Sequence, residues 1–196
     1  MKAEAPPSLE VVLHVIEILE DLDLEYHLGG SFASAIHGVP RQTMDVDLVV
    51  ALDADRTAAL VQHLEDTFYV DLDVAVDAVG RRGSFNAIHL ASGFKVDFFV
   101  KGEADYDDIE LQRSVHVQIS TDPPRSAAVK SAEDTVLRKL QWYQAGGEVS
   151  DRQWRDVLGV MVANRGGLDQ EYLDRWANRL GIEDLLRQAA REAGHI

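Results

Sequence analysis

The chain has 196 residues, of which 46% are hydrophobic and 27% charged, which suffices for a globular core with a helical addition. It contains no cysteine, so disulfides, thiolate zinc sites and cysteine nucleophiles are excluded. Its formal net charge of −15 repels phosphate backbones at long range, which argues against broad, non-specific binding to nucleic acid.

The first part of the chain alternates between helical and strand-like patterns. Residues 8–22 and 53–67 carry apolar side chains at helical spacing, whereas residues 45–51 form a mainly apolar run typical of a buried strand. Two apolar runs within residues 83–100 flank a short turn, which predicts a β-hairpin. In chain order we expect a helix over 8–22, a strand over 26–28, a helix over 31–37, a strand over 45–51, a helix over 53–67, a helix within 69–80, the hairpin, a helix over 104–113 and a strand over 115–119.

After Pro123-Pro124 the pattern becomes wholly helical. Glycines, which commonly end helices, separate the four predicted helices. We expect these helices over residues 131–145, 150–164, 168–180 and 182–193. The fold class predicted is therefore mixed α/β (α+β), with a small mixed sheet flanked by helices and a C-terminal helical bundle.

The charge changes at the same place as the pattern. Residues 1–124 hold 8 Lys/Arg and 23 Asp/Glu, whereas residues 125–196 hold 11 of each. We therefore expect two domains, 1–124 and 125–196, and the acidic first part would suit a basic protein partner. No apolar run is long enough to span a membrane, and no basic segment followed by an apolar stretch begins the chain. We expect no membrane association and a cytoplasmic location.

Asp45 and Asp47 are the first candidate site residues. They are two positions apart on a predicted strand, so both carboxylates face the same side while Val46 and Leu48 face the core. Two carboxylates on one face are ligands that Mg²⁺ prefers, and they leave other metal positions for water and substrate phosphates. An Asp-x-Asp pair is also common at solvated strand ends. Here, however, the strand is otherwise apolar, and two neighbouring buried acids need a cation.

Two further features point to the same chemistry. Gly29-Gly30-Ser31 follows a predicted strand and opens a helix, where glycine lets the backbone approach a phosphate and helix N–H groups bind anions. Asp97 lies in the apolar strand of residues 94–100, where a lone carboxylate is costly without a partner. Taken singly, Gly29-Gly30-Ser31 could be an ordinary turn, and Asp97 could form a salt bridge. If the two strands are neighbours, Asp97 completes a three-carboxylate site.

Together these residues resemble the nucleotidyltransferase superfamily. Gly30-Ser31, thirteen residues, Asp45-Val46-Asp47-Leu48 and a later strand Asp match its signature over about residues 24–100. The resemblance implies transfer of a nucleoside monophosphate from an NTP to an acceptor, with Mg²⁺ or Mn²⁺ bound by Asp45, Asp47 and Asp97. Gly29, Gly30 and Ser31 would bind the nucleotide, and Arg41, in a flanking loop, would contact phosphate or lie free on the surface.

The chain also looks like the subgroup that contains the AbiEii-type toxins, which carry a Lys-bearing helix and a further Asp after the core. Lys139 and Asp156 fit those places and would bind the nucleotide, with Lys139 neutralising the triphosphate. Two alternatives stay open, because Lys139 could extend along its apolar stripe to solvent and Asp156 could pair with Arg152 four residues earlier. The acceptor, whether RNA, protein or a small molecule, is not indicated. A non-catalytic nucleotide- or partner-binding protein of the same fold is the other interpretation.

Overall fold

A computed structural model describes residues 7–41 and 43–194, and the chain forms two compact units. The first unit comprises Met1–Leu28 and Thr43–Val129, and the second comprises Gly29–Gln42 and Lys130–Ile196. The chain therefore passes from one unit to the other three times. The expected boundary at residue 124/125 differs from this division, because 29–42 group with the C-terminal residues and 125–129 with the N-terminal ones.

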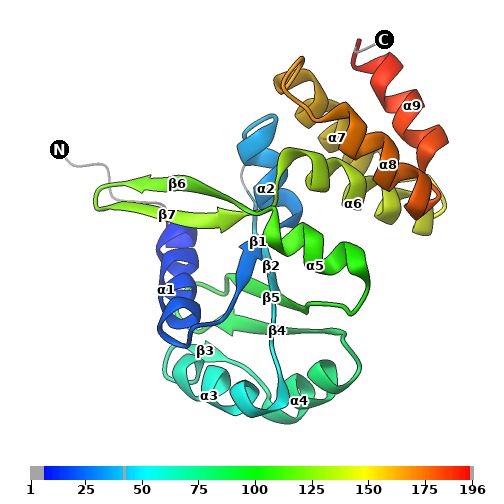
Figure 1. Ribbon diagram of the computed structural model, residues 1–196. Helices are drawn as coiled ribbons and strands as arrows, with labels where there is room; N and C mark the ends of the chain where they lie inside the picture. Colours follow the sequence, from blue (N-terminus) through cyan, green and yellow to red (C-terminus); the bar gives the residue numbers. More distant parts are fainter. Residues whose placement is uncertain (1–6, 42, 195–196) are drawn as a thin grey trace. The chain divides into compact units, whose positions relative to one another are not determined.

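The first unit is built on a mixed sheet (Figure 1), whose described strands follow the order β3-β4-β5-β2-β1-β7-β6. The central strand β2 runs parallel to β5 and antiparallel to β1. The strands are β1 (Tyr26–Leu28), β2 (Asp45–Val50), β3 (Phe68–Tyr69), β4 (Ser84–His89), β5 (Lys95–Val100), β6 (Val115–Thr121) and β7 (Pro124–Val129).

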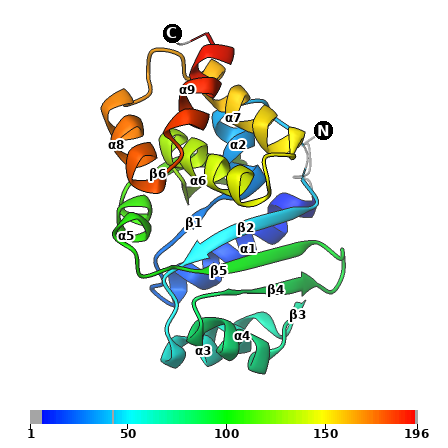
Figure 2. The same cartoon turned by 90° about the vertical axis from the view of Figure 1, so that its right-hand side faces the viewer.

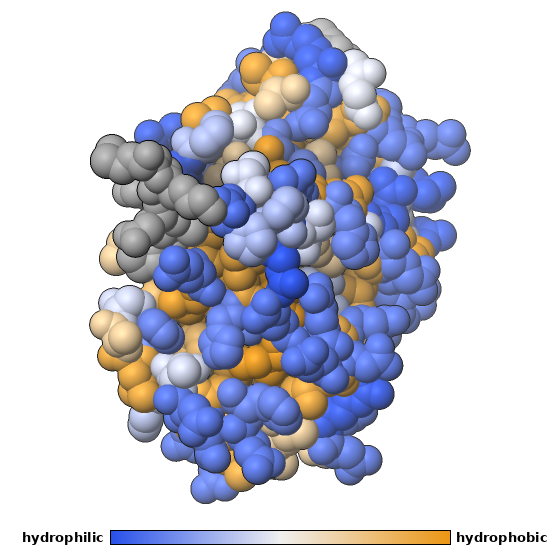
Figure 3. All heavy atoms as spheres, turned by 90° about the vertical axis from the view of Figure 1, so that its left-hand side faces the viewer, coloured by the Kyte–Doolittle hydropathy of each residue, from blue (hydrophilic) through white to orange (hydrophobic). Residues whose placement is uncertain are grey.

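The core of this unit lies on one face of the sheet. Val46, Leu48 and Val50 of β2 alternate with less buried residues, and Val96 and Phe98 of β5 repeat the pattern. Helix α1 lies beside the sheet in both Figure 1 and Figure 2. Figure 3 looks onto that side, where hydrophilic side chains cover most of the surface and hydrophobic areas are smaller. The helices of this unit are α1 (Pro7–Asp21), α3 (Ala54–Leu64), α4 (Leu72–Gly80) and α5 (Asp105–Gln112).

Strand β7 is the main element that the sequence pattern did not predict. At the break expected at Pro123-Pro124, Asp122 and Pro123 form the turn of a β6–β7 hairpin and Pro124 begins β7, which also pairs with β1 through Leu28 and Val129. A strand can begin with proline, because its first residue does not have to donate an N–H hydrogen bond to the neighbouring strand. The segment Pro124–Val129 lacks the alternation that identifies strands, because its buried residues come consecutively.

The second unit is helical. It consists of α2 (Gly30–His37), α6 (Ala132–Ala145), α7 (Asp151–Ala163), α8 (Gln170–Leu180) and α9 (Glu183–Glu192). Helix α2 contacts α6 and α7, which explains why it groups with residues distant in the sequence. At Gly38 a Cβ would lie 2.9 Å from the backbone carbonyl carbon of Gly159, so glycine permits this close approach.

The fold class predicted from the sequence is confirmed: a mixed sheet with flanking helices, and a helical bundle formed largely by the C-terminal residues. None of the helices in the described ranges is long and apolar enough to cross a membrane.

Candidate functional site

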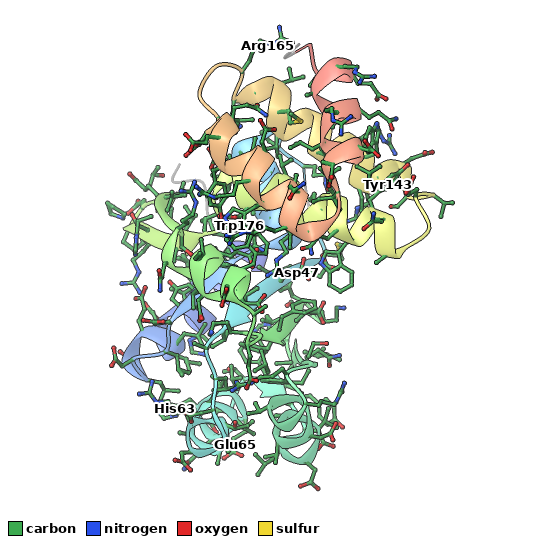
Figure 4. The ribbon with its side chains drawn as sticks, turned by 45° about the vertical axis from the view of Figure 1, so that its right-hand side comes forward. Asp47, His63, Glu65, Tyr143, Arg165 and Trp176 are labelled. Carbon is green, nitrogen blue, oxygen red and sulfur yellow. The ribbon has the colours of Figure 1, made fainter. Side chains whose placement is uncertain are left out.

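Asp45, Asp47 and Asp97 lie on one face of the sheet in the first unit. Strands β2 and β5 pair in parallel so that Asp47 is directly opposite Asp97 and Asp45 is opposite Lys95. Because side chains alternate along a strand, these four share the face that is turned away from the buried valines. Figure 4 labels Asp47 on β2. We call Asp45, Asp47, Asp97 and Lys95 the acidic face.

Lys95 is a member of the acidic face that the sequence analysis missed. Its Nζ lies 2.6 Å from Oδ2 of Asp97, and the side chains are 42% and 18% exposed, respectively. The hydrogen bond to Asp97 raises the pKa of Lys95 above its ordinary value, assisted by the charges of Asp97, Asp45 and Asp47 and opposed by partial burial. The sequence did contain a signal for this pair: Lys95 and Asp97 are two residues apart, a spacing that places both side chains on the same face of a strand.

Asn86 extends the same row of residues on β4. Strand β4 pairs antiparallel with β5 so that Asn86 lies opposite Asp97, and Asp97 in turn lies opposite Asp47. The side chain of Asn86 is exposed. An amide placed beside a carboxylate can donate a hydrogen bond to it or offer a further oxygen to a cation. No sequence pattern marked Asn86, because its proximity depends on strand pairing.

The donor chemistry of the acidic face suits Mg²⁺, because three carboxylates on neighbouring strands are hard oxygen ligands. In residues 7–41 and 43–194, however, no group of three or more His, Cys, Asp or Glu side chains has the geometry of a metal site. One oxygen of Asp97 is bound to the ammonium of Lys95 instead. The role of the three aspartates in metal binding therefore stays a prediction, and in this structure the cation bound to Asp97 is Lys95.

Ser31 lies in the second unit, in the first turn of α2. Its Oγ accepts hydrogen bonds from Nη2 of Arg41 at 2.6 Å and from Nη2 of Arg152 at 2.8 Å. Gly29 precedes the helix and provides no side-chain cap, and Gly30 has a positive φ of 50°. The first N–H groups of α2 therefore have no side chain at the N-cap, the condition under which helix ends bind anions.

In the same unit, an ion pair connects Lys139 of α6 with Asp156 of α7. Nζ of Lys139 lies 2.8 Å from Oδ2 of Asp156, Nη2 of Arg41 lies 3.3 Å from the same oxygen, and Lys139 and Asp156 are each 12% exposed. Lys139 therefore does not extend into solvent. The ion pair considered between Arg152 and Asp156 is also corrected, since Arg152 bonds to Ser31 while Lys139 and Arg41 take the carboxylate.

Charge explains the protonation state of Asp156. Burial alone would raise the pKa of this carboxyl, but the hydrogen bonds and charges of Lys139 and then Arg41 lower the pKa below its ordinary value. Asp156 is therefore an anion held by two cations, within a group that also contains Arg152. We call Arg41, Lys139, Arg152, Ser31 and Asp156 the cation cluster.

The cation cluster has three positive groups and one negative group, so it retains positive charge. In addition, Nε of Arg41 is buried and has no hydrogen-bond partner among the residues that the structure describes, which leaves an N–H donor unsatisfied there. Guanidinium groups bind phosphate through several N–H donors at once. The cluster therefore has the donors and the charge that a phosphate needs, and Arg152 is the member that the sequence analysis did not assign to it.

No protein-family model matches the chain, and no curated protein matches its sequence. Several solved structures are similar. A nucleotidyltransferase-like antigenic protein from Paracoccidioides brasiliensis shares 18% identity at a TM-score of 0.54, with 94% of this chain and 92% of that chain covered. ANT(2'')-Ia in complex with adenylyl-2''-tobramycin shares 13% identity at a TM-score of 0.57, covering 89% and 97%.

A solution structure of ANT(2'')-Ia is also similar, with 16% identity and a TM-score of 0.53, and the match covers 95% of this chain and 96% of that chain. At these identities the similarity concerns the fold alone. It extends over nearly the whole chain and includes a protein described as nucleotidyltransferase-like. The chain therefore has a nucleotidyltransferase-type fold.

Proposed function

We propose that the protein is a metal-dependent nucleotidyltransferase that moves a nucleoside monophosphate from an NTP to an acceptor hydroxyl or phosphate. The observation that carries the proposal is the pairing of β2 with β5, which aligns Asp47 with Asp97 and places Asp45 on the same face. Three carboxylates this close repel one another, and a divalent cation bound among them would offset that repulsion.

Asp45, Asp47 and Asp97 would supply the oxygen ligands. Mg²⁺ or Mn²⁺, when bound, would neutralise charge on the α-phosphate and on the leaving oxygens. The acceptor oxygen forms a bond to the α-phosphorus while the bond from that phosphorus to the α–β bridging oxygen breaks, and pyrophosphate leaves with the electron pair. Asp97 would take the proton of an acceptor hydroxyl, the role of a general base.

The cation cluster would bind the triphosphate. Lys139, Arg41 and Arg152 carry the charge that this chemistry needs, and Arg41 has a buried N–H that no described residue satisfies. Gly29, Gly30 and Ser31 would let the β- and γ-phosphates approach the N-terminus of α2. Asp156 would hold Lys139 and Arg41 in place, since both contact the same carboxylate oxygen. Positive groups that are fixed before the reaction stabilise the charge of departing pyrophosphate.

The acceptor could be RNA, protein or a small molecule. Tobramycin in the complex of ANT(2'')-Ia is a small molecule joined to an adenylyl group, which supports testing this class first. A relation to AbiEii-type toxins, a toxin–antitoxin role with a basic partner and a cytoplasmic location are further proposals. A small basic protein encoded in the adjacent reading frame would support the toxin–antitoxin role.

The decisive experiment is incubation with each radiolabelled NTP, Mg²⁺ and three acceptor classes: total tRNA, protein and small hydroxylated compounds. Transfer of label by the wild-type protein, and its loss in Asp45→Asn/Asp47→Asn, would support the proposal. If nucleotide and metal raise the melting temperature but no label is transferred to any acceptor, the protein is a non-catalytic nucleotide binder instead. In that case the same fold would serve binding alone.

A further inference from the structure

We propose that Lys95 is a built-in counter-ion of the acidic face, which a divalent metal must displace from Asp97. The inference rests on the proposed metal-dependent function and deepens it. It predicts that Lys95 weakens metal binding while it stabilises the protein without metal, so that removing this lysine makes the site bind metal more tightly.

The position of Lys95 is determined by strand pairing. Lys95 lies opposite Asp45, and Asp97, two residues later, lies opposite Asp47. A side chain on this strand face has carboxylates beside it on its own strand and across from it on the next. Nζ of Lys95 lies 2.6 Å from Oδ2 of Asp97, so one oxygen of that carboxylate already has a cationic partner.

A metal ion and the lysine would compete for the same carboxylate. A metal bound to either oxygen of Asp97 would lie close to this ammonium, and the two cations repel each other at contact distance. A metal shared by Asp45, Asp47 and Asp97 therefore requires the ammonium of Lys95 to move away.

An ordinary surface ion pair would predict a different result. Exposed pairs contribute little to stability, and removing one leaves distant binding unchanged. Lys95 differs because three acids share its face, so its removal takes a positive charge away from among them. Lys101 provides a matched control, since it follows β5 in the same unit and pairs with Asp108 instead.

The test is titration of the full-length protein with Mn²⁺, followed by electron paramagnetic resonance of the free ion. Lys95→Gln is expected to bind Mn²⁺ on the order of tenfold more tightly. This is about the effect of removing the repulsion between one ammonium and a nearby divalent cation at a solvent-exposed site. Lys95→Arg, which keeps the charge, and Lys101→Gln, which makes the same charge change elsewhere, should remain within about twofold of wild type.

Thermal unfolding gives a second measurement that does not depend on activity. In EDTA, Lys95→Gln should melt below Lys101→Gln, and Mn²⁺ should raise its melting temperature by more. In an Asp97→Asn background, Lys95→Gln should raise Mn²⁺ affinity by less than it does in the wild type, because Asp97 no longer holds the ammonium beside the metal.

The outcomes separate this inference from the proposed function. If Asp45→Asn/Asp47→Asn removes Mn²⁺ binding but Lys95→Gln binds no more tightly than wild type, the counter-ion role of Lys95 is overturned and the metal site stands. If Mn²⁺ binding is absent, or unaffected by the aspartate changes, both are overturned.

Discussion

Asp47 of β2 and Asp97 of β5 lie directly opposite each other on parallel strands, although 49 positions separate them in the sequence. Opposed like charges on neighbouring strands are destabilising unless a cation is shared. In the structure the ammonium of Lys95 binds one of the two, Asp97. The same arrangement makes the acidic face a candidate for a divalent metal, and the following predictions test each part of it and of the cation cluster.

The double substitution Asp45→Asn/Asp47→Asn should abolish the stabilisation by metal. For the wild type, NTP with Mg²⁺ or Mn²⁺ should raise the melting temperature more than NTP alone, since ligands that bind the folded state stabilise it. The variant should show no added effect of metal. Ser84→Ala on the neighbouring strand β4 is a control that leaves all four acidic-face residues in place. An unchanged effect of metal in the double variant would rule out a metal site here.

Asp97→Asn should separate binding from turnover. If Asp97 is the general base, nucleotide affinity should change little, because Asp45 and Asp47 still bind the metal. Turnover should fall by about 10²–10⁴, the usual contribution of a positioned base. The ion pair with Lys95 is partly exposed, so the free energy of unfolding should change by less than about 1 kcal/mol. Single-turnover rates together with urea unfolding check both parts, and full activity in the variant would exclude the role.

Lys139→Met should lower both stability and nucleotide affinity. The sequence alone suggested that an apolar residue would suit the stripe on this helix. In the structure Asp156 is mostly buried and forms an ion pair with the ammonium of Lys139. Because the variant leaves this carboxylate without one of its partners, the free energy of unfolding should fall by about 1–3 kcal/mol. Nucleotide affinity should fall by about 1.5–3 kcal/mol, the range for a lost charged hydrogen bond.

A double-mutant cycle controls the Lys139 prediction. In Lys139→Met/Asp156→Asn both partners are removed, so part of the lost stability should return while nucleotide affinity stays low. Measurements by urea unfolding and by calorimetric titration with NTP distinguish the two effects. Wild-type nucleotide affinity in a folded Lys139→Met protein would leave the lysine with a structural role only.

Asp156 should make stability depend on pH in the acid range. Its folded pKa is lowered below the ordinary value of 3.8, so its contribution is present above that value and is lost as the pH falls through the folded pKa. Asp156→Asn lacks this titration. The difference in unfolding free energy between wild type and variant should be constant above about pH 5 and shrink below about pH 3.8. A difference that stays constant down to pH 3 would contradict the lowered pKa.

Gly38→Ala should destabilise the second unit. The added Cβ would lie 2.9 Å from backbone atoms of Ser34, Gly159 and Val160, none of which can move without shifting a helix. We expect a loss of about 1–3 kcal/mol, typical of overpacking. Gly80→Ala is the matched control, because a Cβ there meets nothing within 4 Å. Equal unfolding free energies for the two variants would show that α2 and α7 can separate without cost.

Much of the local structure was predictable because it depends on short-range pattern. Strand β1 was predicted at its observed bounds, and strand β2 and helices α6–α9 within one or two residues, since period, glycine stops and capping residues act locally. Strands β3 and β7 were missed. The first has two residues, and the second exists because β6 and β1 pair with it, which no local pattern reveals.

The sequence by itself determined which acids could share a face: alternation places Asp45 beside Asp47 and Lys95 beside Asp97 on their own strands. Only the tertiary structure decided that β2 pairs with β5 in register, that Lys95 therefore lies opposite Asp45, and that Arg41 and Lys139 meet at Asp156. The physical reason is that alternation is a property of a single strand. Strand register and ion-pair choice, in contrast, depend on packing between segments far apart in the chain.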